Sequence, residues 1–331
     1  MDIIRKNSNN GAFYYVHRKT KKKINNNSLL KRIHSLKIPP GYKQVKIAAN
    51  SNSKVQCIGT DTKKRKQYIY HPQWEEQQKK IKFIDLIQFG KKIKRIKRDI
   101  NKNLNKCYNN TRLLNNKDNI ISLVLYLIDY CNFRVGCEKY KQLYNSYGVT
   151  TLNNTHFKFN KNNISIEFIG KKGVLNKNKV NNTNICSLLK LLCNNNNDEY
   201  VFTYIDKNND KYRITEKHIN DYLKKYHKNL SVKMFRTWNA NYILLKELLN
   251  LELPNTNKIA KQNINIAIKK AAVQLHHSSN VSKKSYMNNE IVDLYLENPM
   301  KFKKLVESFR KKNGNLPTIN RLLNQILYHL S

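Results

Sequence analysis

Residues 276–287 (HHSSNVSKKSYM) contain a tyrosine whose surroundings could support nucleophilic chemistry. Asn280 and Ser282 are favourable helix N-cap residues, and the amphipathic pattern after them predicts a helix. Tyr286 would lie in the first turns of that helix, with Lys283 three positions before it on the same face. A phenol with a pKa of about 10 is a poor nucleophile at neutral pH, so a packing or surface role is the alternative for this one of 20 tyrosines.

Three cations occupy positions that indicate a bound anion. Arg134 follows the apolar run of residues 120–128, where a guanidinium is costly unless it meets an anion or an ion-pair partner. Lys233 and Arg236 are three positions apart in a predicted helix, so they share one face and repel each other unless an anion lies there. A structural salt bridge is the alternative for the first, and a solvated basic face is the alternative for the other two.

The composition predicts a polyanionic partner, because the formal net charge is +41 and the pI is near 10.0. Nucleic acid is the first candidate and an anionic membrane surface the second. The longest apolar run is too short to span a bilayer, and residues 1–6 lack the apolar core of a signal peptide. We therefore expect no membrane association.

The cysteine and glycine patterns exclude several classes of protein. Six cysteines lie at irregular spacings with no C-x-x-C pair, which argues against a disulfide scaffold or a zinc ribbon and for a reducing compartment. Only 9 glycines occur, and the phosphate-binding G-x-x-x-x-G-K-[ST] pattern is absent. A nucleotide-hydrolysing motor is therefore not expected.

The pattern of the chain changes from strand-rich to helical near residue 80. Before that point, four β-favouring runs predict the strands of a small antiparallel sheet: residues 13–16, 44–48, 55–59 and 67–70. Residues 28–33 predict one short helix beside it. Afterwards apolar residues recur at helical spacing, residues 102–116 predict a fraying helix end and a loop, and residues 155–180 predict three short strands. We therefore expect an α+β protein with an N-terminal β domain, residues 1–79, and a larger, mainly α-helical domain with a short three-stranded sheet, residues 80–331.

Beyond the tyrosine segment, spacing predicts three further helices, at about residues 288–297, 300–311 and 318–330. This tail is expected to extend the second domain without a function of its own.

Five separated segments together resemble the motifs of type IB DNA topoisomerases of the poxvirus kind. Their sequences are GTDTKKRKQYIYHPQW (59–74), RVGCEKY with SYGVTTL (134–152), FIGKKGV (168–174), KMFRTWNANY (233–242) and the tyrosine segment. In that family a histidine precedes the nucleophilic tyrosine by nine positions, which selects His277 for Tyr286. Lys64 and His276 stand where the family usually has glycine, so the turn geometry and the choice between His276 and His277 stay open.

The resemblance implies a role for each matching residue. It implies that the nucleophile is Tyr286, that the phosphate is held by Arg134, Arg236 and His277, and that the leaving oxygen receives its proton from Lys171 with help from Lys233. It implies DNA contacts by Tyr68, Tyr70, Arg65, Lys66, Tyr140 and Lys172.

The resemblance also implies a function. Such an enzyme relaxes supercoils of either sign by transient cleavage of one strand through a 3′-phosphotyrosyl bond, without ATP or a metal cofactor. It would act on double-stranded DNA as a monomer that clamps the duplex through its N-terminal domain, and it would prefer a pyrimidine-rich pentamer. A location in the viral particle and the host cytoplasm is implied by the resemblance alone.

Two other functions fit parts of the sequence. A tyrosine recombinase shares the same constellation and catalytic fold, but it typically has histidine where Lys233 stands and lacks the Q-Y-x-Y-H-P-x-W run. A non-catalytic basic DNA-packaging protein would explain the charge but would need no ordered set of catalytic residues.

Overall fold

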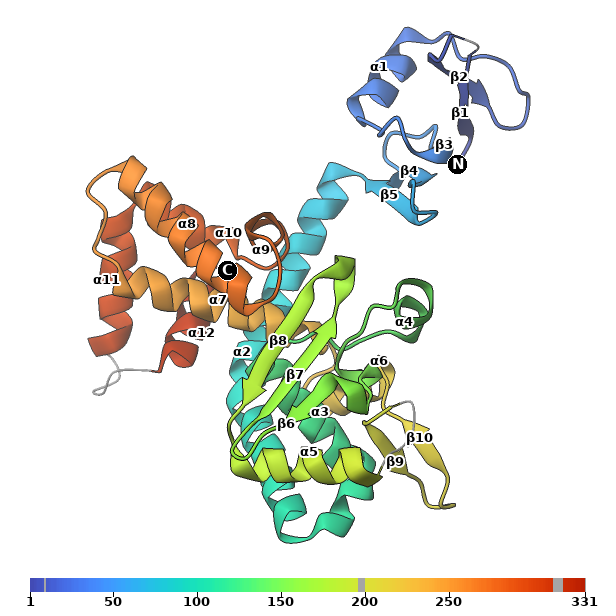
Figure 1. The fold of residues 1–331 in the computed structure, drawn as a ribbon. Coiled ribbons are helices and arrows are strands. Elements are labelled where there is room, and N and C mark those ends of the chain that lie inside the picture. The colour runs from blue at the N-terminus through green and yellow to red at the C-terminus, as the bar shows by residue number, and fades with distance from the viewer. Residues whose placement is uncertain (9, 196–199, 312–317, 331) are drawn as a thin grey trace. The chain divides into compact units, whose positions relative to one another are not determined.

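The structure, a computed structural model, describes residues 1–8, 10–195, 200–311 and 318–330 (Figure 1). The chain divides into two compact units, Met1–Lys82 and Phe83–Ser331. The first unit holds an antiparallel sheet, and the second is mainly helical with a small three-stranded sheet. The α+β class expected from the sequence is confirmed.

The first unit is a five-stranded sheet in the order β2-β1-β3-β4-β5, with every neighbouring pair antiparallel. The strands are β1 (Ile3–Asn7), β2 (Phe13–His17), β3 (Lys43–Ile47), β4 (Val55–Thr60) and β5 (Lys66–Tyr70). Helix α1 (Asn27–Ser35) begins at Asn26, whose side chain accepts a hydrogen bond from the Leu29 amide. The core of this unit comprises Ile3, Tyr15, Ile24, Ile33, Val45, Ile47 and Cys57.

Buried Arg5 holds the loop between α1 and β3. Its guanidinium donates to the carbonyl oxygens of Pro39, at 3.1 Å, and Pro40, at 3.2 Å. It also donates to Tyr42 O, at 2.5 Å. Pro39 O also accepts from the Tyr42 amide at 3.1 Å. One side chain therefore supplies several of the donors that the carbonyls of this loop need.

Helix α2 (Pro72–Asn109) is longer at both ends than the sequence predicted. Pro72 suits the first helical position, where no amide donor is needed, so the helix begins before residue 80. The expected loop at residues 102–116 is wrong as far as residue 109, because Leu104 and Cys107 continue the buried stripe of Ile93, Ile96 and Ile100. Burial of this stripe outweighs the low helix propensity of the asparagines around it.

The remaining helices of the second unit are α3 (Lys117–Cys131), α4 (Glu138–Tyr144), α5 (Thr183–Asn195), α6 (Glu216–Lys224), α7 (Lys233–Asn250), α8 (Asn257–Gln274), α9 (Ser279–Ser285), α10 (Asn289–Glu297), α11 (Pro299–Lys311) and α12 (Ile319–His329). Short 3-10 turns lie at Thr111–Asn115, Val149–Thr151, Asn154–His156 and Lys171–Gly173. No helix in the described residues combines the length and apolarity needed to cross a bilayer.

Two small sheets complete the second unit. The expected three strands are β6 (Phe157–Phe159), β7 (Ile164–Ile169) and β8 (Leu175–Val180), paired antiparallel in that order. A hairpin is formed by β9 (Thr203–Ile205) and β10 (Lys211–Arg213).

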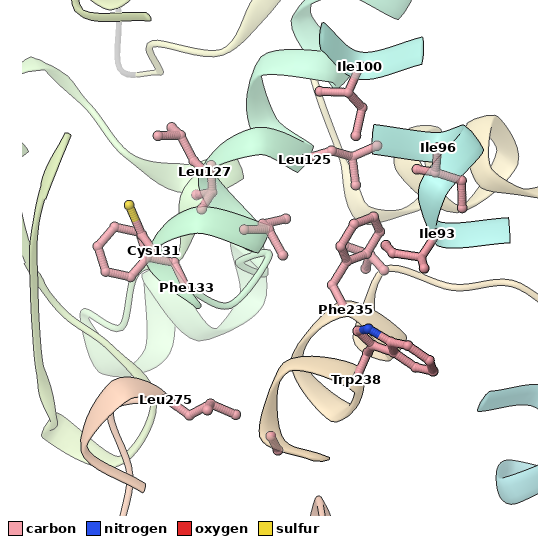
Figure 2. Packing of buried hydrophobic residues seen from close by; sticks show 14 of the residues in the cluster. Ile93, Ile96, Ile100, Leu125, Leu127, Cys131, Phe133, Phe235, Trp238 and Leu275 are labelled. Carbon is pink, nitrogen blue, oxygen red and sulfur yellow. The ribbon is translucent and has the colours of Figure 1, made fainter. Parts of the chain in front are cut away.

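Helix α7 passes through the main core and carries two of its large, fully buried aromatic side chains. Phe235 and Trp238 are fully buried, and Figure 2 shows them beside Ile93 and Ile96 of α2. The Phe235 ring lies edge-on to Phe89, 5.0 Å between centroids. Close packing of these rings therefore fixes the position of α7 in the core.

Gly90 provides a test of this packing, because a Cβ added there would lie 2.5 Å from the Trp238 ring. Alanine normally stabilises a helix interior relative to glycine by about 1 kcal/mol. Here we expect Gly90→Ala to lower the free energy of unfolding, by about 1–3 kcal/mol, because of overpacking. Denaturant titration measures this, with exposed Asn101→Ala on the same helix as the control. A more stable Gly90→Ala protein would contradict the packing described.

Candidate active site

Arg236 is a guanidinium buried within the main core. It is 4% exposed, one position after Phe235 on α7. Its Nη2 donates to the carbonyl of Leu275 at 2.7 Å, which joins α7 to the end of α8. Its Nε and Nη1 are buried without a hydrogen-bond partner in the described part of the chain. Burial, and then the nearby Arg134, lower the pKa of Arg236 to about 10. Two unused donors on a buried cation form a site that an anion would satisfy.

Arg134 approaches the same place from the loop between α3 and α4. The loop is held by its backbone, because the Val149 amide donates to the Arg134 carbonyl at 2.9 Å. Gly136, with φ +99°, and Gly148 lie so close that a Cβ on Gly148 would be 2.6 Å from the Gly136 Cα. Only glycines fit this crossing of two backbones, which explains why the R-V-G and S-Y-G motifs occur together.

Tyr286 lies at the end of a helix, and the prediction that it lies in the first turns of one is wrong. Helix α9 begins after Ser278, whose hydroxyl caps the Val281 amide, and ends at Ser285. A new helix, α10, begins after Asn288. Since several residues in this stretch are good N-caps, the sequence did not show which would be used. The Tyr286 amide donates to the carbonyl of Ser282 at 3.0 Å.

Asn241 is a residue whose role the sequence analysis missed. It is fully buried on α7, and its Nδ2 donates to the Tyr286 carbonyl at 2.8 Å. Its Oδ1 accepts from the Asn288 amide at 2.7 Å. One side chain therefore holds the backbone on both sides of the α9–α10 junction, which fixes the position of Tyr286. The available signal was an asparagine among core positions of α7, which is costly unless it is fully hydrogen-bonded.

Two guanidinium groups lower the pKa of Tyr286. The ring is half-buried, and burial alone would raise the pKa of the phenol. The positive charges of Arg236 and Arg134 outweigh burial and hold this pKa below its ordinary value. Arg236 Cζ lies 5.5 Å from the centroid of the ring. The site therefore favours the phenolate, the nucleophilic form.

His277 stacks on Tyr286, with 4.9 Å between ring centroids and 15° between planes. Its Nδ1 lies 3.2 Å from the carbonyl of Ser278, which assigns the ring proton to Nδ1. Its Nε2 is buried without a partner in the described residues. Burial, followed by Arg236, lowers the pKa of His277 to about 4. The ring is therefore neutral at neutral pH until an anion approaches Nε2.

His276 has different surroundings. Its Nε2 lies 3.1 Å from the carbonyl of Cys131, and its ring packs on Phe133 at 5.5 Å. Its φ is +53°, in the left-handed region that glycine adopts without strain. His276 therefore adopts a backbone conformation that suits glycine, and its side chain contacts the core.

The two candidate lysines do not contact the tyrosine in the described part of the chain. Lys171 is exposed in the turn between β7 and β8, followed by exposed Lys172, whose φ is +66°. Lys233, the first residue of α7, is 77% exposed and pairs with Glu216 at 3.2 Å. The structure thus brings together Tyr286, Arg134, Arg236 and His277, and leaves both lysines at the surface.

The first unit presents an aromatic ladder on β5. Tyr68 and Tyr70 stack at 6.1 Å, as the predicted strand alternation requires, and Tyr70 stacks on Trp74 of α2 at 4.2 Å. Lys54 Nζ lies 4.5 Å from the Trp74 ring. Tyr68 is 47% exposed, so the ladder ends in an uncovered ring.

The basic turn before β5 is held by Asp61. Arg65 pairs with this carboxylate at 2.6 Å, and this hydrogen bonding lowers the pKa of Asp61 to about 2. Lys64 has φ +58°, so the turn keeps a left-handed position without glycine. Lys66 is exposed at the start of β5, and Tyr140, 49% exposed, lies on α4 of the second unit.

Together these groups can stabilise an anionic centre beside a nucleophile. The idle donors of Arg236, the Arg134 guanidinium and a protonated His277 would neutralise the oxygens of a phosphate that Tyr286 attacks. Among the described residues, no three His, Cys, Asp or Glu side chains converge as metal ligands.

Comparisons with known proteins agree along most of the chain. The family described as eukaryotic DNA topoisomerase I, catalytic core, matches residues 63–313, and the bacterial DNA topoisomerase IB N-terminal domain matches residues 12–61. DNA topoisomerase 1B of Acanthamoeba polyphaga mimivirus is 34% identical over 277 residues, covering 82% of this chain and 81% of the relative. DNA topoisomerase I of monkeypox virus is 25% identical over 242 residues, covering 72% and 71%.

The charge state of Tyr286 can be tested in the free protein. We expect its phenol to titrate below the ordinary pKa of tyrosine, and Arg236→Met to raise that pKa, because burial would then be opposed by Arg134 alone. NMR titration of ring-labelled tyrosine measures both, with Tyr286→Phe to assign the signal. Tyr226, whose pKa is raised chiefly by burial, is the internal control. A Tyr286 pKa unchanged by Arg236→Met would contradict this account.

Proposed function

The chain belongs to the type IB DNA topoisomerase family, and we propose that Tyr286 is the nucleophile with which it cleaves one strand of duplex DNA. The phenolic proton leaves to water, and the phenolate attacks a phosphodiester in line. A bond forms between the tyrosine oxygen and phosphorus, the bond to the 5′-oxygen breaks, and a 3′-phosphotyrosyl linkage remains. Resealing reverses these steps, so the energy of the linkage is kept and no ATP is needed.

The observation that carries this proposal is the convergence of Arg134, Arg236 and His277 on Tyr286. In the transition state, charge develops on the nonbridging oxygens of the phosphate. The unused Nε and Nη1 of Arg236 are already fixed donors, so little reorganisation is needed when the charge appears. Removing one such donor commonly lowers the rate by about 10²- to 10³-fold.

The leaving 5′-oxygen needs a proton, and we assign Lys171 as the general acid with Lys233 as its helper. Both ammonium groups are exposed, and Lys233 would exchange Glu216 for a phosphate oxygen when DNA binds. Breaking the exposed ion pair between Lys233 and Glu216 costs little stability, since exposed ion pairs contribute about 0–1 kcal/mol.

The DNA contacts that we propose lie on both units. On the first unit the exposed end of the aromatic ladder, Tyr68 with Tyr70, would read base edges, while Arg65 and Lys66 contact phosphates or bases. On the second unit, Tyr140 and Lys172 would contact the backbone. We propose residues 1–79 as a clamp domain and residues 80–331 as the catalytic domain of a monomer.

The finer properties of the enzyme are also proposals. Relaxation of positive and negative supercoils follows from rotation of the free end about the intact strand. Affinity for DNA should fall steeply with salt concentration. The cations of a chain of net charge +41 displace counterions condensed on the DNA phosphates when it binds. We propose a preference for a pyrimidine-rich pentamer, and a location in a viral particle and the host cytoplasm on the basis of the viral relatives.

Plasmid relaxation tests the proposed function. The purified protein should relax supercoiled plasmid of both signs in EDTA without ATP, and Tyr286→Phe should lose this activity while still binding DNA. Tyr328→Phe, which alters an exposed tyrosine of α12, is the matched control and should relax normally. A wild-type protein that binds but never relaxes plasmid would favour a packaging protein, and an active Tyr286→Phe would exclude this nucleophile.

The pH dependence tests His277. A phosphate beside Nε2 should raise the pKa of His277 from about 4, because the imidazolium then gains a counter-charge. The protonated ring is the donor, whereas His277→Asn offers a donor that does not titrate. Both proteins gain phenolate as the pH rises, so the single-turnover rate of the wild type at saturating DNA, divided by that of His277→Asn at the same pH, should fall through the DNA-bound pKa of His277. Identical profiles for the two proteins would argue against donation by His277.

A further inference from the structure

Helix α4 and the β9–β10 hairpin are labelled in Figure 1. A network of charged and polar side chains joins the start of α4 to the end of the hairpin. The carboxylate of Glu138, the first residue of α4, pairs with the guanidinium of Arg213, the last residue of β10. The hydroxyl of Tyr200 donates to the same Glu138 oxygen at 2.7 Å. Segments 62 and 75 residues away along the chain therefore meet at one carboxylate.

The Tyr200 ring strengthens this junction. Lys141 Nζ, one turn after Glu138 on α4, lies 4.1 Å from the ring centroid, and Arg213 Cζ lies 4.7 Å from it. Both are within the range of cation–π attraction. Tyr200 therefore contacts α4 through its hydroxyl and through its ring.

The burial of this pair distinguishes it from the solvated pairs nearby. The side chains of Arg213 and Glu138 are 24% and 27% exposed, whereas those of Lys224 and Asp221 on α6 are 54% and 50% exposed. Removing one partner of a partly buried, hydrogen-bonded pair leaves the other charge unpaired. The exposed pair on α6 should contribute little.

The position of Glu138 relates the network to catalysis. Glu138 lies four residues after Arg134, and the intervening Gly136, with φ +99°, turns the chain from Arg134 towards α4. On its other side the loop is held at the Arg134 carbonyl by the Val149 amide. The next carbonyl, that of Val135, accepts from the Thr150 amide at 2.7 Å and from its hydroxyl at 2.8 Å. The anchor at Glu138 adds a restraint at the far end of the loop, where α4 begins.

We propose that Glu138, Arg213 and Tyr200 are positioning residues that fix α4 and so hold Arg134 against the reacting phosphate. This inference rests on the proposed function of Tyr286 and Arg134. Arg213 would act indirectly, through its ion pair with the Glu138 carboxylate. The competing explanation is that Arg213 contacts DNA directly.

Substitutions at both ends of the ion pair separate these explanations. We would measure the single-turnover cleavage rate at saturating duplex, and the slope of binding affinity against salt, for Arg213→Ala, Glu138→Ala and the double variant. Misplacement of a catalytic group by about 1 Å can cost about 10²-fold in rate. We therefore expect each single variant to cleave about tenfold or more slowly, with the salt slope unchanged. The double variant should be no slower than the slower single variant, because both remove one interaction.

Conservative variants and a matched control keep the test informative if an alanine variant is unstable. Arg213→Lys should recover part of the rate, and Tyr200→Phe should slow cleavage less than Arg213→Ala. Lys224→Ala removes a cation from the exposed pair on α6 and should cleave like the wild type.

Two results would overturn the positioning network. One is a normal cleavage rate in Glu138→Ala. The other is a salt slope smaller by about 0.9 in Arg213→Ala with a normal rate at saturation, which would make Arg213 a phosphate contact. Both results require a wild-type protein that cleaves, so an inactive wild type would instead overturn the proposed function.

Discussion

Arg236 is the group on which the rest of the site depends. A guanidinium that is 4% exposed, with two donors unpartnered in the described residues and a second guanidinium nearby, is unfavourable in a protein without a ligand. The same arrangement becomes favourable when a phosphate supplies the missing acceptors. The free protein therefore carries a local energetic cost that a bound phosphate would relieve. The same two positive charges stabilise the phenolate of Tyr286, and this attraction lowers the pKa of the phenol.

The fold holds this unfavourable cation in place through the helix that bears it. Phe235 and Trp238 anchor α7 in the largest core, while the Leu275 carbonyl accepts from Arg236 at 2.7 Å. Asn241, further along α7, fixes the backbone at Tyr286. Arg236 and Tyr286 are thus placed by one helix, so a shift of α7 would move both together.

The sequence predicted the elements better than their junctions. Strands β6 to β8 and the helices of the tail follow from regular apolar spacing, because burial imposes that period. The break after α9 did not follow, since Ser278, Asn280, Ser282 and Asn288 are all acceptable caps and only tertiary contacts select among them. Asn241 is one such contact, and it lies 45 residues before Tyr286 in the chain.

The cations show a second limit of the sequence. Lys233 and Arg236 are three positions apart on α7. The Lys233 side chain is 77% exposed and pairs with Glu216, whereas Arg236 is buried. Charge and helical spacing are the same for both, so the difference comes from the elements that cover each position. The family resemblance predicted that Arg134 and Arg236 lie close together in the folded chain. No local sequence pattern predicts this proximity.

The most direct measurement of the central claim is the chemical identity of the covalent adduct. The protein would be trapped on a duplex whose cleaved strand loses a short 3′ fragment, digested, and analysed by mass spectrometry. We predict a single modified peptide that contains Tyr286, linked to the 3′-phosphate of the retained strand. An adduct at another residue, or a linkage to a 5′-phosphate, would contradict the site described.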